Sequence, residues 1–273
     1  MILTSTQTIL VIISGGIVGF TLGLLGGGGS ILAIPLLLYF VGIRDAHVVI
    51  GTSALAVAAN AYINLISHWR AGHVAWKPAV AFAIPGVVGA FAGSSLGKLV
   101  PDKPLLSLFA ILMIVIAVLM IRPKKSKAAS HPQGQQGELA TAVPRYEFHW
   151  ARVITGGFIV GMLSGFFGIG GGFLIVPGLV FSAGLPMIMA IGSSLFSVGT
   201  FGLTTAVSYA LSGLVDWVVV LEFIGGGIIG GLIGALLAGK LSKQQRTLNY
   251  IFAIIIIVVA IYMLVINLRT LHL

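Results

Sequence analysis

The sequence predicts an all-α integral membrane protein made of two homologous halves, and three observations carry this prediction. Hydrophobic residues make up 58% of the 273 residues and charged residues only 8%, whereas a soluble domain has about 25% charged residues. Apolar runs of about 20 residues, the length that an α-helix needs to cross a bilayer, recur along the chain. The glycines of the first half recur in the second half at a nearly constant offset.

Polar clusters and Gly/Pro clusters separate the apolar runs into 8 to 10 membrane segments. The first half contains runs at 5–25, 30–42, 47–69, 76–98 and 104–121, and the second half at 150–168, 173–184, 187–211, 215–238 and 246–267. The first run lacks the charged start and cleavage site of a secretory signal, so we interpret it as a membrane segment. Residues 122–147 are polar and predict a flexible linker between an N-terminal repeat, 1–121, and a C-terminal repeat, 148–273.

The internal repeat follows from the positions of glycine, proline, serine and tryptophan. With an offset of 142, residues Gly15, Gly19, Gly23, Gly26, Gly28, Gly29, Pro35 and Gly42 fall on Gly157, Gly161, Gly165, Gly168, Gly170, Gly171, Pro177 and Gly184. With an offset of 141, residues Gly51, Ser53, Ser67, Gly72, Trp76, Gly86, Gly89 and Gly93 fall on Gly192, Ser194, Ser208, Gly213, Trp217, Gly227, Gly230 and Gly234. The short segment after each glycine cluster either completes a crossing or returns as a re-entrant hairpin. Both options return the chain to the side of the membrane on which it started. With the three spanning helices that follow, each half crosses the membrane an odd number of times. This predicts that the second half is inverted relative to the first, an inverted-topology repeat.

Contiguous glycines separate the first two apolar runs of each half, at 26–29 and 170–172. Glycine runs carry a large entropy cost in a helix, so we expect a broken helix or hairpin at both places. Broken backbone is tolerated at membrane depth where it is buried or lines a cavity, and a helix N-terminus there favours an anion. We expect the two segments, restarting near Ser30 and Phe173, to meet in a small anion site, or else to serve only as tight packing turns. The glycines of this candidate site are Gly26, Gly27, Gly28, Gly29, Gly170, Gly171 and Gly172.

Polar residues recur at helical spacing on the third segment of each half and complete the candidate site. These candidate ligands are Ser30, Ser53, Asn60, Asn64, Ser193, Ser194 and Thr205. Such residues either bond neighbouring helices or line a pathway. Glu222 lies six residues beyond Asp216, about 9 Å deeper if helical, which makes it a candidate coupling residue or an interfacial acid.

The basic net charge of +9 follows from short loops rather than from a nucleic-acid surface. Most Lys and Arg fall on the linker side of the proposed topology, which predicts a cytoplasmic linker with both chain termini outside. The absence of cysteine excludes disulfides and thiolate metal sites. No metal-ligand spacing, phosphate loop or nucleophile elbow is present, so we expect no metal, no cofactor and no enzymatic activity.

The two glycine-rich stretches "GLLGGGGSILAIPLLL" and "GFFGIGGGFLIVPGLV", each followed by a "G[TS]S" segment, resemble the repeated signature of the TauE/SafE family of membrane permeases. The resemblance covers nearly the whole chain apart from the linker. It implies transport of sulfite, organosulfonates or other sulfur-containing anions across the bacterial inner membrane, and it supports Gly26 to Gly29, Pro35, Gly168, Gly170 to Gly172 and Pro177 as signature positions.

The leading hypothesis is a secondary transporter that moves a small sulfur-containing anion by alternating access, in the export direction. A permease for a carboxylate on the same scaffold is one alternative. A membrane scaffold or receptor that presents the linker to a partner is another. Exposed glycine faces would also permit a homodimer.

Overall fold

The computed structural model describes residues 4–121, 150–170, 172–241 and 245–269, and in these residues every regular element is helical. The elements of the first half are α1 (Ser5–Leu25), η1 (Gly26–Leu32), α2 (Ala33–Pro35), η2 (Leu36–Phe40), α3 (Ala46–Arg70), α4 (Trp76–Gly97) and α5 (Asp102–Ile121). Those of the second half are α6 (Trp150–Phe167), α7 (Gly172–Ala183), α8 (Met187–Ala210), α9 (Trp217–Leu241) and α10 (Gln245–Arg269). The predicted linker, 122–147, lies outside the described residues.

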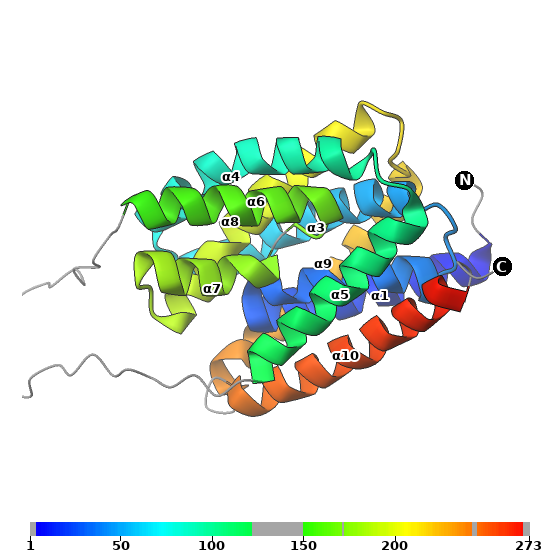
Figure 1. Cartoon of the computed structure of the whole chain (residues 1–273). Helices are drawn as coiled ribbons and strands as arrows, with labels where there is room; N and C mark the ends of the chain where they lie inside the picture. The colour runs from blue at the N-terminus through cyan, green and yellow to red at the C-terminus, as the bar shows by residue number, and fades with distance from the viewer. Residues whose placement is uncertain (1–3, 122–149, 171, 242–244, 270–273) are drawn as a thin grey trace, which may run out of the picture.

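The long helices run between two ends of the molecule (Figure 1). We call the end where α1 begins and α10 ends the terminal end, and the end where α5 ends and α6 begins the linker end. The helices α1 and α6, which the sequence repeat relates, run in opposite directions between these ends. At the terminal end, Gln7 Nε2 donates to Val41 O at 3.4 Å, so the chain has returned to its starting end after α1.

The glycine clusters break the helices, as predicted. In the first half α1 ends at Leu25, and Gly26 adopts a φ of 70° with a ψ of −144°, a backbone conformation that is open to glycine and strained for other residues. In the second half α6 ends at Phe167, and Gly168 and Gly170 have φ values of 67° and 64°. Each half therefore contains a hairpin, α1 to η2 from the terminal end and α6 to α7 from the linker end.

One detail of the first hairpin differs from the prediction. The return segment does not restart near Ser30, because a 3₁₀-helix begins at Gly26 itself, and a π-helical turn over Leu36–Phe40 completes the hairpin. Ser30 Oγ donates to Gly27 O at 3.0 Å and so satisfies a carbonyl within this tight coil. In the second half the return helix α7 begins at Gly172, next to the predicted start.

Contacts between the two halves are reciprocal. The helix α1 packs along α9, and its counterpart α6 packs along α4. At the residue level, a Cβ added to Gly15 would meet Phe223 O, and one added to Gly157 would meet Phe82 O. The pairs α3 with α8, α5 with α10 and η1 with α7 each join one element to its own counterpart. Each contact from the first half to the second is therefore matched by an equivalent contact from the second half to the first.

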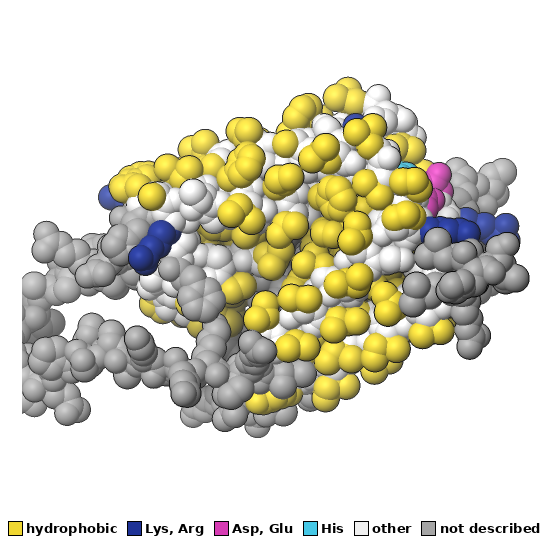
Figure 2. Space-filling view, in the orientation of Figure 1, with side chains coloured by type: hydrophobic (Ala, Val, Ile, Leu, Met, Phe, Trp, Pro, Cys, Tyr) yellow, Lys and Arg dark blue, Asp and Glu magenta, His cyan; other side chains and the backbone are white. Residues whose placement is uncertain are grey.

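A hydrophobic band covers the molecule between its ends (Figure 2). Lys and Arg side chains on this face gather mostly toward the two ends, with the acidic side chains at the terminal end. Among the described residues, seven helices are long and apolar enough to cross a membrane, and two shorter apolar helices accompany them. The chain is thus an all-α, multi-pass membrane protein, as its composition predicts.

Candidate functional site

A single stripe of α3 carries three of the seven predicted polar ligands. Positions 53, 57, 60, 64 and 68 follow one another at intervals of four or three residues, so they fall within an arc of about 80° on a helix. All five side chains are buried: Ser53, Val57, Asn60, Asn64 and His68. We call these residues the site stripe. Asn60 lies about 21 Å from the start of α3 and about 15 Å from its end, near the middle of the helix.

The second glycine cluster lies against this stripe. A Cβ added to Gly168 would overlap Ile50 Cγ2, and one added to Gly170 would lie 3.5 Å from Val57 Cγ1 and 3.2 Å from Val198 Cγ1. Gly170 therefore sits between the midpoints of α3 and α8. Gly171 lies outside the described residues.

The first glycine cluster reaches α8 in the matching way. Gly26 faces Ile191, which is the counterpart of Ile50, and the Gly27 amide donates to Ser194 Oγ at 3.3 Å. Ser194 Oγ in turn donates to Ile191 O at 2.7 Å. The segment η1 also contacts α7, the return helix of the other hairpin. The structure thus brings both glycine-rich segments to the α3–α8 pair.

Asn60 is the least satisfied polar residue of the stripe. Its side chain is fully buried, and neither Nδ2 nor Oδ1 has a hydrogen-bond partner among the described residues. The amide lies against the backbone of Gly227 on α9, where any larger residue would overlap it. Asn64 Nδ2 donates to Asn60 O at 2.9 Å, and Asn64 lies between Gly23 of α1 and Gly231 of α9.

The remaining predicted ligands are buried and engaged in hydrogen bonds. Ser53 Oγ donates to Ile50 O at 3.2 Å, and Thr205 Oγ1 donates to Phe201 O at 2.9 Å. Ser193 Oγ accepts a hydrogen bond from Ala75 N at 2.9 Å, just before α4 begins. Its hydroxyl therefore holds the start of α4.

The matching stripe on α8 has a different chemistry. Asn60, Asn64 and His68 correspond to Phe201, Thr205 and Tyr209 at the offset of 141. Phe201 fills the space beside Gly86 that Asn60 fills beside Gly227. The stripe on α3 is therefore polar from Asn60 to His68, whereas Phe201 interrupts the matching stretch on α8.

These features fit a site that holds a small solute through neutral donors. Buried amide and hydroxyl groups lie beside irregular, glycine-rich backbone near the middle of two crossing helices. In membrane proteins such backbone lines binding sites of transporters. In a comparison with known proteins, a family model described as "Sulfite exporter TauE/SafE" matches residues 11–263.

The chain belongs to the TauE/SafE family.

Relatives in this family have been named as transporters. A probable membrane transporter protein of Xylella fastidiosa (strain 9a5c) is 51% identical over 96% of this chain and 97% of its own length. The probable membrane transporter protein YunE of Bacillus subtilis is 27% identical over 92% of this chain and 95% of its own length. The probable membrane transporter protein MJ0441 of Methanocaldococcus jannaschii is 31% identical over 72% and 68%. No solved structure matches the chain. The protein is thus a membrane transporter of the TauE/SafE type.

Glu222, the predicted coupling residue, lies apart from the stripe of this TauE/SafE protein. It is five residues before Gly227 on α9, and therefore about 140° around the helix from the position that meets Asn60. The side chain is half-buried, and Oε2 is buried without a partner among the described residues.

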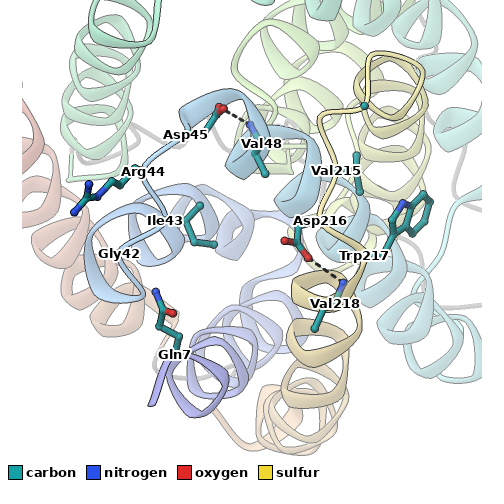
Figure 3. Close-up of a pocket in the computed structure, with 11 residues that line it drawn as sticks. Gln7, Gly42, Ile43, Arg44, Asp45, Val48, Val215, Asp216, Trp217 and Val218 are labelled. Atoms are coloured by element: carbon teal, nitrogen blue, oxygen red, sulfur yellow. Dashed lines mark hydrogen bonds between the residues drawn. The ribbon is translucent and has the colours of Figure 1, made fainter. Parts of the chain in front are cut away.

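A pocket of about 740 Å³ opens at the terminal end and was not expected from the sequence (Figure 3). Gln7, Arg44, Asp45 and Asp216 contribute its polar side chains. Both carboxylates cap helices: Asp45 accepts from Val48 N at 3.0 Å, and Asp216 accepts from Val218 N at 3.1 Å. The signal that could have found this pocket is the pair of acidic residues, each just before a membrane helix. In the TauE/SafE protein this pocket is an opening at the terminal end, between the first turns of α1, α3 and α9.

Proposed function

We propose that this transporter moves small sulfur-containing anions, such as sulfite or an organosulfonate, across the bacterial inner membrane by alternating access, in the export direction. The observation that carries the proposal is the site stripe, in which the unpartnered amide of Asn60 lies on the same face of α3 as Val57, which contacts Gly170. A buried amide without a partner is costly, by about 1–3 kcal/mol. A solute that supplies the missing hydrogen bonds would recover that cost.

We further propose that the halves form an inverted repeat around this site. The reciprocal contacts support it. The helix α1 packs on α9, and their counterparts α6 and α4 pack on each other in the same way. Matched contacts of this kind are typical of an interface with two-fold symmetry. The opposite directions of α1 and α6 also support it, since they require an axis perpendicular to the helices (Figure 1). Such repeats can rock about a fixed central site and expose it to either side.

The charges support a cytoplasmic linker end with the chain termini outside. Arg70 and Lys77 flank the turn between α3 and α4 at the linker end, whereas Arg44 and Lys103 lie at the terminal end. The polar linker adds Arg122, Lys124, Lys125, Lys127 and Arg145 to the linker side. An excess of Lys and Arg marks the cytoplasmic side of bacterial membrane proteins.

Export is the direction that the membrane potential favours. Moving one negative charge out of a negative-inside cell is favourable by about 2.3 kcal/mol per 100 mV. Uniport of a monovalent anion would then need no coupling ion, whereas uptake would need one. Glu222 remains a candidate for carrying that ion.

The test is flux in proteoliposomes that contain the purified protein. Sulfite, thiosulfate, sulfoacetate, sulfate and a carboxylate such as acetate are compared, each with and without an imposed membrane potential. The proposal expects selective movement of a sulfur oxyanion, accelerated when the potential is negative on the anion-loaded side. Because neutral amides bind any oxyanion, a carboxylate that moves equally well would replace sulfur specificity with a general organic-anion permease.

A further inference from the structure

His68 is a buried titratable residue at the linker end of the site stripe, and the proposed transport cycle assigns it no role. It is 5% exposed and lies in the last turn of α3. The inference below rests on the proposed function, because it concerns how the same site balances the charge of its anion.

The contacts of His68 leave one ring nitrogen available. Its Nε2 lies 3.4 Å from Gly23 O, in the last turn of α1 before the first glycine cluster. A carbonyl oxygen only accepts hydrogen bonds, so Nε2 carries the hydrogen and Nδ1 is the acceptor of the neutral ring. Nδ1 is buried and has no partner among the described residues. A proton added at Nδ1 would create both a positive charge and a new donor.

Among the described residues, His47 also has a buried Nδ1 without a partner, but its Nε2 lies 3.2 Å from Asp102 Oδ1 at the terminal end, away from the site stripe. The buried polar set comprises Ser14, Ser30, Thr52, Ser53, Asn60, Asn64, His68, Ser94, Ser164, Ser182, Ser193, Ser194, Ser197, Thr205, Ser208 and Asn267. His68 is the one member of this set that can become a cation. Removing an anion from water is costly unless a charge or several hydrogen bonds compensate it, so His68 is the natural source of that charge.

The surroundings of His68 permit a positive charge there. From the α3–α4 turn, the ring of His73 lies 6.1 Å away between centroids, and Arg70 on α3 is exposed. The neighbouring helices present small, uncharged residues: α1 contributes Gly23, and α9 contributes Gly231 and Ala235 beside it. A second histidine and an arginine disfavour an isolated cation, so an incoming anion is needed to stabilise it.

The other half has no equivalent group. The counterpart of His68 is Tyr209, whose phenol cannot become a cation. Cation-forming groups do lie beside Tyr209, since Lys98 Nζ is 5.8 Å from its ring centroid and the His47 ring is 6.2 Å away. They lie at the terminal end, whereas His68 belongs to the site stripe itself.

We propose that His68 binds a proton when the anion binds, so that the anion is held beside an imidazolium cation. The step is a simple protonation. Neutral His68 takes one proton from water at Nδ1 as the anion enters, and it returns that proton to water when the anion leaves. Asn64, one turn before His68 on the same face of α3, then supplies a neutral hydrogen bond to the same anion.

The experiment is calorimetric titration of the purified, detergent-solubilised protein with sulfoacetate. Measurements at several pH values, in buffers of different ionisation enthalpy, give both the affinity and the number of protons taken up. We expect uptake of up to one proton per anion. Affinity should fall by up to about tenfold per pH unit as the pH rises through the range in which His68 of the anion-free protein loses its proton. In His68→Gln both the proton uptake and this pH dependence should disappear. The matched control His73→Gln should retain them.

Other outcomes would overturn the proposal. Proton uptake that persists in His68→Gln, or that is lost in Glu222→Gln instead, would remove His68 from this role. If the wild type binds sulfoacetate without taking up a proton, the proposed protonation of His68 is wrong, whereas the proposed transport function is unaffected. A wild type that neither binds nor transports any tested anion would refute the proposed function as well. His68→Tyr, which introduces the residue of the matching position, provides a second variant if the glutamine variant does not fold.

Discussion

The Gly27 amide donates a hydrogen bond to Ser194 Oγ across 167 positions of sequence, at 3.3 Å. It joins the tip of the first hairpin to a central helix of the second half. Both groups are buried, so neither can turn to water if the other is lost. The position of the first glycine cluster against α8 therefore depends on this serine.

Ser194→Ala removes the acceptor and leaves the Gly27 N–H buried without a partner. We expect a loss of about 1–3 kcal/mol in the free energy of unfolding, measured by denaturation in detergent, together with reduced anion flux. Ser95→Ala is the matched control, because Ser95 Oγ donates only to Phe91 O in its own helix. Equal stability of the two variants would mean that the hairpin tip does not depend on Ser194.

Gly168→Ala tests the contact between the second hairpin and α3. Gly168 and Gly184 have φ values of 67° and 64°, so alanine meets a similar backbone strain at both, about 1–2 kcal/mol. Only at Gly168 would the new Cβ also overlap Ile50, whereas Gly184 has nothing within 4 Å. We expect Gly168→Ala to lower both stability and flux further than Gly184→Ala does. Indistinguishable variants would show that backbone strain alone matters there.

The sequence predicted the elements of the fold well because membrane helices depend on local properties. Apolar runs located the membrane segments, and glycine clusters located the breaks in two hairpins. The 3₁₀-helix that begins at Gly26 was missed, because the hydrogen bond from Ser30 to Gly27 O that fits this coil is a detail of local geometry. The pocket at the terminal end was missed because Gln7 and Asp216 meet only after folding.

Asn60→Leu separates function from stability. Leucine has the same branched skeleton of heavy atoms as asparagine and removes two buried polar atoms that lack partners. This gain offsets the crowding by its larger methyl groups, so the stability should change little. Transport should fall by about tenfold or more, the effect of losing roughly 1.4 kcal/mol of solute binding. Asn267→Leu is the contrasting variant, since Asn267 Nδ2 donates to Tyr39 OH at 3.1 Å and its loss should lower stability.

Flux that survives Asn60→Leu unchanged would move the solute path away from the site stripe. The sequence placed Asn60 in the candidate site from its helical spacing. It could not show that Asn60 is unpartnered while Ser193 is engaged with Ala75 N, since both facts depend on the packing of distant helices.

Gly19→Ala tests the close packing of α1 on α9. A Cβ at Gly19 would overlap the backbone of Gly227, whereas one at Gly16 would lie 3.6 Å from Gly226 O, an ordinary contact. We expect Gly19→Ala to cost about 1–3 kcal/mol by overpacking and Gly16→Ala to cost much less. Thermal unfolding of the two variants in the same detergent measures the difference. A reversed order would contradict the packing of α1 against α9.

The central claim is that a small anion binds at the site stripe and that the site opens to one side of the membrane at a time. The chain contains no cysteine, so Ser53→Cys introduces a single thiol at a fully buried position of the stripe. Labelling by a membrane-impermeant maleimide is measured from each side of oriented vesicles, with and without sulfoacetate. The account predicts labelling that sulfoacetate slows, with a change in the accessible side when the anion gradient is reversed. A variant that still transports, yet is labelled at a rate that sulfoacetate does not alter from either side, would contradict it.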